Sequence, residues 1–192
     1  MVGYSGSDPS AAREMIQKHR VGGIILFARN IQNAAHARTV CTELQEMRKE
    51  VADTPLFIAV DQEGGCVARI TEGVTIFPGN MALGATDSEE LAGQAGEVTG
   101  QELNSLGINV NFAPVLDIST NPRNPGVGAR SFGSDPGRAG ILGAAMIRGM
   151  QAHGLLATAK HFPGLGEAKV DSHDELPLVD LPRTRLEQVE LE

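Results

Sequence analysis

The chain has 192 residues, of which 41% are hydrophobic and 21% charged, and its formal net charge is −8. This composition indicates one globular domain and excludes a disordered chain. The acidic balance and the lack of a Lys/Arg cluster argue against nucleic-acid binding, and no apolar run is long enough to cross a membrane.

Short apolar runs rich in β-branched residues predict five strands. These runs show little alternation between polar and apolar residues, which is typical of strands buried on both faces of a parallel sheet. The five runs span residues 1–4, 23–27, 56–60, 108–115 and 155–159.

Capping residues mark the starts of helices between these runs. Asp8-Pro9 and Asp135-Pro136 each place a cap before a proline, and Asn33 is a third cap. A further helix is expected after Thr86, because Glu89 follows it at the spacing of a capping box. Pro182 opens the last helix, and the expected helix ends are Gly22-Gly23, Gly107 and Gly154.

Apolar residues at helical spacing predict which faces of two helices are buried. The helix after Asn33 would bury Ala37, Val40, Cys41, Leu44 and Met47, and the helix after Thr86 would bury Leu91, Ala95, Val98 and Leu103.

The alternation of strands and helices predicts an α/β fold with parallel strands and right-handed crossovers. Two architectures fit this order. One is an open, doubly wound sheet, for which five strands suffice, and the other is a TIM barrel, which needs eight strand–helix units.

Polar residues follow four of the five predicted strands. Residues 28–30, 61–65 and 160–161 do so directly, as does Asp117 with the long segment to Asp135. Parallel α/β folds place functional sites at the carboxyl ends of strands, so we expect these residues to meet at one rim. No nucleotide-binding or metal-ligand motif is present, and the sequence therefore predicts neither a cofactor nor a metal.

Four stretches of the sequence resemble one family. Residues 160–173 read KHFPGLGEAKVDSH, which is similar to the signature of the β-N-acetylglucosaminidase branch of glycoside hydrolase family 3. Residues 22–30, the DQEGG element at 61–65 with Arg69, and residues 111–117 with the RSFG element at 130–133 resemble further segments of this family.

The resemblance decides between the two architectures. The family fold is a TIM-type (β/α)8 barrel, so residues 1–192 would be a single catalytic-domain segment that holds about the first five βα units. We expect the family's nucleophile, an Asp from a later strand, to lie beyond Glu192. An incomplete barrel would expose apolar strand edges and could self-associate.

The resemblance also implies roles for individual residues. Asp61, Arg69, Arg130, Lys160 and His161 would hold the hydroxyl groups of a sugar, for which charged groups form strong and directional hydrogen bonds. For Arg130 the alternative is a salt bridge that fixes its loop.

The family's general acid/base is a His on the loop after the fifth strand, which here is His173. Asp171 would orient the His173 ring and stabilise its charged form. An imidazole suits this role because its unperturbed pKa of about 6.5 is near neutrality. If His173 is not the acid, Glu175 becomes the candidate.

Three residues depart from the family pattern, namely Cys66, Leu165 and Glu167, which stand where relatives often have Arg, His and Asp. They put the conformation of the loops and the details of the subsites in question.

Three functions are compatible with these observations. The first is a retaining exo-β-N-acetylglucosaminidase that removes terminal GlcNAc from chitin- or peptidoglycan-derived saccharides through a covalent glycosyl-enzyme. The second is a phosphorylase of the same family, and the third is a non-catalytic sugar-binding fragment. No signal peptide is visible and the cysteines match no disulfide framework, which favours a cytoplasmic location, although a segment before Met1 could carry a secretion signal.

Overall fold

Four parallel strands form the sheet of this protein in the order β1-β2-β3-β4. The computed structural model describes residues 1–171 and 174–192. The strands are β1 (Gly23–Leu26), β2 (Phe57–Val60), β3 (Val110–Asn111) and β4 (Leu156–Ala157). Each strand pairs with the one that precedes it along the chain, so that Ile24 lies opposite Ile58 and Val110 opposite Leu156.

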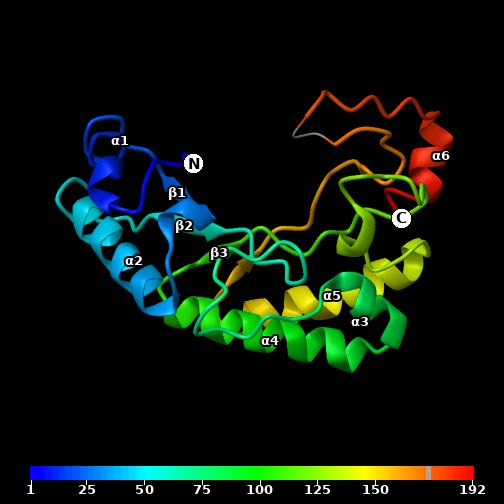
Figure 1. Ribbon diagram of the computed structural model, residues 1–192, viewed down its shortest axis with the longest axis horizontal. Helices are drawn as coiled ribbons and strands as arrows, with labels where there is room; N and C mark the ends of the chain where they lie inside the picture. Colours follow the sequence, from blue (N-terminus) through cyan, green and yellow to red (C-terminus); the bar gives the residue numbers. More distant parts are fainter. Residues whose placement is uncertain (172–173) are drawn as a thin grey trace.

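Helices connect the successive strands and lie along the outside of the sheet (Figure 1). Helix α2 joins β1 to β2, helices α3 and α4 join β2 to β3, and α5 joins β3 to β4. The α-helices are α1 (Arg13–Gln17), α2 (Ala34–Lys49), α3 (Asn80–Thr86), α4 (Glu89–Ser105), α5 (Pro136–Ala152) and α6 (Arg183–Gln188), with 3-10 turns at Pro9–Ala12, Ala28–Asn30 and Gly128–Arg130.

Most of the predicted helix caps are confirmed. Asn33 accepts a hydrogen bond from the backbone N–H of His36 at 2.9 Å, and Asp135 accepts one from Arg138 at 2.8 Å. The capping-box prediction at Thr86 is wrong, since Thr86 is the last residue of α3. Asp87 adopts a left-handed conformation that separates the two helices, and Ser88 caps α4 instead.

The predicted buried face is confirmed for α2 and only partly for α4. All five predicted residues of α2 are buried, whereas Leu91 of α4 is 44% exposed. Small residues such as Gly96 and Gly100 form the inner face of α4, because its backbone lies directly against α5. A Cβ atom on Gly96 would lie 2.2 Å from the carbonyl oxygen of Met146. Large apolar residues at helical spacing do not mark a face of this kind, so the sequence pattern misses it.

Three of the five strand predictions need correction. The predicted run 108–115 is a strand only over Val110–Asn111. Residues 1–4 contribute only a single parallel bridge, between Val2 and Ile24. Strand β4 is not buried on both faces, since Leu156 is 49% exposed. This strand ends the sheet, and within the described residues no further strand pairs with it. Also within these residues, no helix is both long and apolar enough to cross a bilayer.

Candidate active site

The predicted site residues gather at the carboxyl ends of the strands. Asp61 follows β2 directly, Asp117 comes six residues after β3, and Lys160 and His161 follow β4. A parallel bridge between Val115 and Lys160 extends the pairing of β3 and β4 to this rim. Arg130 reaches the same place from the 3-10 turn Gly128–Arg130.

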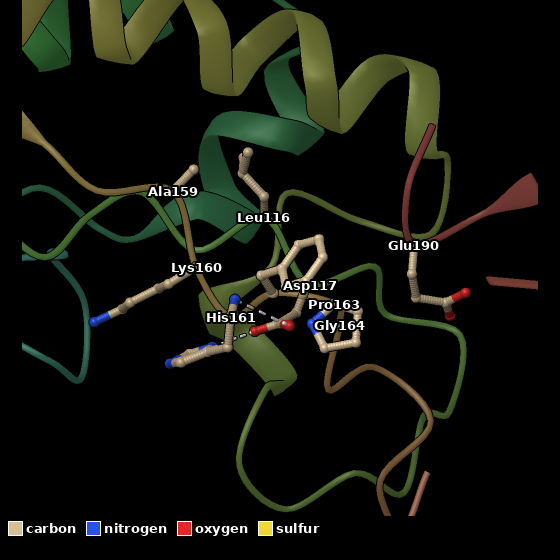
Figure 2. A pocket seen from close by; sticks show the side chains of 9 residues that line it. Leu116, Asp117, Ala159, Lys160, His161, Pro163, Gly164 and Glu190 are labelled. Atoms are coloured by element: carbon tan, nitrogen blue, oxygen red, sulfur yellow. Dashed lines mark hydrogen bonds and ion pairs between the residues drawn. The ribbon is translucent and has the colours of Figure 1, made fainter. Parts of the chain in front are cut away.

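A cavity of about 170 Å³ lies next to this rim (Figure 2). Asp117, Lys160 and His161 line one side of it, and Glu190 lies on the side opposite Lys160. A smaller cavity of about 30 Å³ lies between Arg130, His161 and Asp171. Three of the predicted binding residues, Arg130, Lys160 and His161, therefore border open space rather than a filled core.

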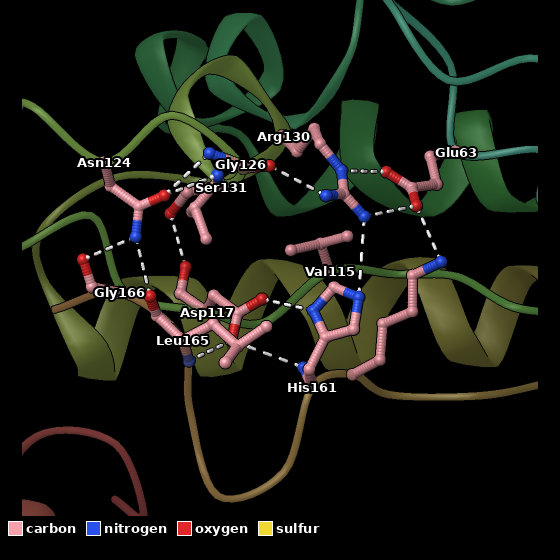
Figure 3. Close-up of polar contacts among 12 residues, drawn as sticks. Glu63, Val115, Asp117, Asn124, Gly126, Arg130, Ser131, His161, Leu165 and Gly166 are labelled. Carbon is pink, nitrogen blue, oxygen red and sulfur yellow. Dashed lines mark hydrogen bonds and ion pairs between the residues drawn. The ribbon is translucent and has the colours of Figure 1, made fainter. Parts of the chain in front are cut away.

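Ion pairs link four of the site's side chains into one cluster. Glu63 accepts two hydrogen bonds from the guanidinium of Arg130, at 2.8 and 2.9 Å (Figure 3). The Lys160 ammonium lies 2.6 Å from a Glu63 oxygen and 2.7 Å from an Asp61 oxygen. We refer to Asp61, Glu63, Arg130 and Lys160 as the charged cluster. The salt bridge considered for Arg130 is thus present, and it joins Arg130 to the rest of the site.

Glu63 is the most enclosed member of the charged cluster. Its side chain is 3% exposed. Burial alone would raise the pKa of Glu63, but the hydrogen bonds and positive charges of Arg130 and Lys160 outweigh this effect and hold the pKa below its usual value. The hydrogen bonds to Glu63 in turn raise the pKa of Arg130. Glu63 and Arg130 therefore stabilise each other's charged form.

Asp117 holds His161 on the other side of the site. An Asp117 oxygen lies 2.5 Å from Nδ1 of His161, and Nε2 of the same ring lies 3.5 Å from a guanidinium nitrogen of Arg130. The imidazole is therefore placed between a carboxylate and the charged cluster.

The DQEGG element forms its turn for local reasons. Gly64 and Gly65 have φ values of +89° and +57°, which other residues rarely adopt. The Gln62 side chain accepts hydrogen bonds from the backbone of Arg69 and Ile70 and donates one to the Ile70 carbonyl. This turn carries Glu63 into the cluster.

The structure does not join Arg69 to the charged cluster. Within the described residues its Nε is buried and has no hydrogen-bond partner. Among the described residues, Arg69 therefore keeps an unused donor, and its predicted binding role stays a prediction.

Asp171 lies beside the site, whereas the prediction for His173 falls outside the described residues. Asp171 lines the small cavity with Arg130 and His161. A Cβ atom on Gly126 would lie 3.3 Å from an Asp171 oxygen, so the glycine allows the carboxylate to approach closely. Glu175, the alternative acid, donates its backbone N–H to the Asp171 carbonyl at 3.0 Å.

The residues that depart from the family pattern lie around the site. Leu165 acts through its backbone, which donates to Asp117 and accepts from Asn124. Glu167 lies 3.4 Å from Arg185, and Cys66 is exposed at a cavity of about 60 Å³ beside Glu63. Within the described residues, no group of three His, Cys, Asp or Glu side chains is arranged to hold a metal ion.

Two residues of the site were not assigned a role from the sequence, namely Glu63 and Asp117. Glu63 belongs to the DQEGG element, and Asp117 follows a predicted strand. Both acids follow a predicted strand in the sequence. This position alone does not distinguish a functional acid from an ordinary turn residue.

The fold and the site together define part of an α/β domain that carries a charged cluster at the carboxyl ends of its parallel strands. A family model described as "Glycosyl hydrolase family 3 N terminal domain" matches residues 2–192, and the chain belongs to this family. The expected α/β class and partial barrel are thereby confirmed.

Curated relatives carry hexosaminidase names. The chain is 45% identical over 188 residues to beta-hexosaminidase A of Pseudoalteromonas piscicida, covering 95% of this chain and 31% of the relative. It is 42% identical over 166 residues to a beta-hexosaminidase of Pseudomonas aeruginosa (strain LESB58), covering 86% of this chain and 48% of the relative. The chain thus spans about a third to a half of these relatives.

Solved structures show the same arrangement. A family 3 β-N-acetylglucosaminidase from Paenibacillus sp. str. FPU-7 superposes with a TM-score of 0.96 at 48% identity, covering 100% of this chain and 36% of that one. NagZ from Neisseria gonorrhoeae, solved in complex with N-trifluoroacetyl-D-glucosamine, gives a TM-score of 0.89 at 34% identity, covering 100% of this chain and 57% of that one.

Proposed function

We propose that this chain is part of a retaining exo-β-N-acetylglucosaminidase that removes terminal GlcNAc from chitin- or peptidoglycan-derived saccharides. The charged cluster carries this proposal, because it places two carboxylates and two cations at a single rim beside open cavities. The hexosaminidase names of the relatives support it.

The charged cluster supplies both kinds of hydrogen-bonding group that a sugar needs. Asp61 is 17% exposed and, among the described residues, pairs with one cation, Lys160, so its oxygens can accept from hydroxyl groups. Lys160 and Arg130 donate only. Adjacent hydroxyls of a pyranose can therefore each meet a charged partner, which gives strong and directional binding.

In this proposal His173 is the general acid/base and Asp171 orients it. His173 protonates the departing oxygen in the first step and activates water in the second. The nucleophile is an Asp supplied by a part of the protein beyond Glu192. It forms the covalent glycosyl-enzyme that water then hydrolyses.

The first test is turnover of an aryl β-N-acetylglucosaminide by the 192-residue chain and by the complete gene product. We expect turnover only when the remaining barrel units are present. An equal kcat for the chain alone would contradict a nucleophile beyond Glu192. Release of GlcNAc-1-phosphate when orthophosphate is added would show a phosphorylase, and GlcNAc binding without turnover by the complete product would show a sugar-binding protein.

The role of His173 is tested with leaving groups of different pKa. In the complete product, His173→Ala should slow substrates with poor leaving groups most, because these need a proton on the departing oxygen. A good aryl leaving group should be affected less in the first step, and the intermediate should accumulate as a burst. His19→Ala, an exposed control, should change neither. Equal losses across all leaving groups would exclude His173 as the acid and point to Glu175.

The cytoplasmic location is also a proposal. Both cysteines are free in the structure, which is typical of proteins in a reducing compartment. Fractionation of the native host tests it, and recovery of the protein with secreted material would overturn it.

A further inference from the structure

Asp117 is a buried carboxylate with an unusual number of partners. Its side chain is fully buried. One oxygen accepts the backbone N–H of Leu165 at 2.7 Å and that of His161 at 3.3 Å, and the other lies 2.5 Å from Nδ1 of His161. The hydroxyl of Ser131 donates to the Asp117 backbone carbonyl at 2.6 Å. Figure 3 shows these contacts converging on the residue.

The two neighbours of the His161 ring assign its tautomer. An ionised carboxylate only accepts hydrogen bonds, so the ring nitrogen that faces Asp117 carries the proton. A guanidinium only donates, so Nε2, which faces Arg130 at 3.5 Å, is the unprotonated acceptor. Both contacts select the neutral ring with hydrogen on Nδ1.

We propose that Asp117 is a positioning residue that holds His161 in this tautomer, so that a sugar hydroxyl in the site can donate to Nε2 in place of the long, 3.5 Å contact with Arg130. The sugar part of this inference rests on the proposed function, whereas the tautomer does not. A ligand that fits this arrangement must have a hydroxyl group that donates a hydrogen bond to Nε2 of His161. Fluorine in place of that hydroxyl cannot donate and should lose the contact.

Asp117 also couples His161 to the segment that follows it. The same oxygen that accepts from the His161 backbone accepts from Leu165. The carbonyl of Leu165 accepts from Asn124 at 2.6 Å, and Asn124 also accepts from the backbone of Gly126, next to Asp171. A change at Asp117 should therefore disturb the ring and the loop that leads to Asp171 together.

Nitrogen NMR of the histidine rings tests the tautomer directly. The complete gene product is labelled with ¹⁵N-histidine, and His161 is assigned from the signal that disappears in His161→Asn. We expect a protonated Nδ1 and an unprotonated Nε2 at neutral pH in the absence of ligand. A proton on Nε2 of the unaltered protein would overturn the proposal without any variant at Asp117.

Two variants separate positioning from stability. An Asn side chain has one acceptor oxygen and cannot serve three donors, so Asp117→Asn should change the His161 ring signals and weaken binding of N-acetyl-D-glucosamine by about tenfold or more. Ser131→Ala removes the neighbouring hydrogen bond but leaves the carboxylate, and it should preserve the ring signals and the affinity.

The outcomes distinguish this inference from the proposed function. Unchanged ring signals in Asp117→Asn, or an equal change in Ser131→Ala, would overturn the positioning role. If the unaltered protein has the assigned tautomer but does not bind N-acetyl-D-glucosamine, the tautomer assignment stands, whereas the proposed function and the sugar contact at Nε2 both fail.

Discussion

The charged cluster and the contact between α4 and α5 stabilise neighbouring parts of the molecule in opposite ways. In the cluster, long side chains from separate loops meet through ion pairs while their backbones stay apart. Between the helices, glycines bring the backbones together with almost no side chain between them. The first arrangement leaves room for a ligand, whereas the second leaves none, so changes in the two regions should have different consequences.

The largest effect is expected for Glu63→Ala. Its removal leaves Arg130 and Lys160 in a largely buried place without their shared partner, which should lower the free energy of unfolding by about 3–5 kcal/mol. Urea unfolding at pH 7 measures this. Glu46→Ala removes an ion pair at the exposed surface and should cost less than about 0.5 kcal/mol. A similar small loss for both variants would show that the cluster is not a structural element.

Glu63 should also make the free energy of unfolding depend on pH in the acid range. The pKa of Glu63 lies below its usual value of 4.5, so its stabilising contribution is present above pH 4.5 and is lost as pH falls through the lower pKa of the folded protein. In Glu63→Gln this part of the acid dependence should be absent.

A smaller effect is expected in the helix pair. A Cβ atom at Gly96 would lie 2.2 Å from a backbone oxygen of α5, which no change of rotamer can relieve, so Gly96→Ala should destabilise the protein by about 1–3 kcal/mol. In the same helix the nearest atom to a Cβ at Gly93 is 4.0 Å away. Gly93→Ala should therefore be neutral or stabilise by up to about 1 kcal/mol. Equal effects of the two alanines would refute close backbone packing.

The sequence predicted these two regions with unequal success. Asp61, Lys160 and His161 stand out because they follow predicted strands, where parallel sheets collect polar groups, and the resemblance to the family gives them and Arg130 their predicted binding roles. Their mutual pairing was not predictable, since it depends on a loop from each of three strands.

The inner face of α4 was missed because close packing of backbones has no large side chains to mark it. Residues 1–4 have the apolar composition of a strand, and the sequence therefore predicts a full strand there. Composition does not show how many residues of the run pair with a neighbouring strand. Capping predictions succeeded where a single Asn or Asp precedes a helix, and failed at Thr86, where two helices follow each other.

Within the charged cluster, Asp61 should differ from Glu63. Lys160 keeps Glu63 as a partner when Asp61 is removed, so Asp61→Ala should leave the thermal midpoint little changed. It should still weaken binding of N-acetyl-D-glucosamine by about tenfold, the cost of one charge-assisted hydrogen bond. Calorimetric titration of the complete gene product measures this, with the exposed Asp53→Ala as control. A large fall in melting temperature with unchanged affinity would make Asp61 structural.

The smallest effect on stability is expected from the two cysteines. Cys41 lies in the apolar interior, whereas Cys66 is exposed near the site. Cys41 is 1% exposed on the inner face of α2, and burial raises the pKa of its thiol from 9.0 to about 12. The folded state therefore favours the protonated thiol, and the resulting stability is present below pH 9 and is lost as pH rises from 9 toward 12. Between pH 9 and 10 this loss should be about 1 kcal/mol.

Burial also raises the pKa of Tyr4, from 10.0 to about 12, so the loss of stability from Tyr4 begins one pH unit higher than that from Cys41. Urea unfolding in the presence of a phosphine reductant should show the loss in Cys66→Ala, because that thiol is exposed, and not in Cys41→Ala. If Cys41→Ala keeps the full alkaline loss of stability, the buried thiol is not its source.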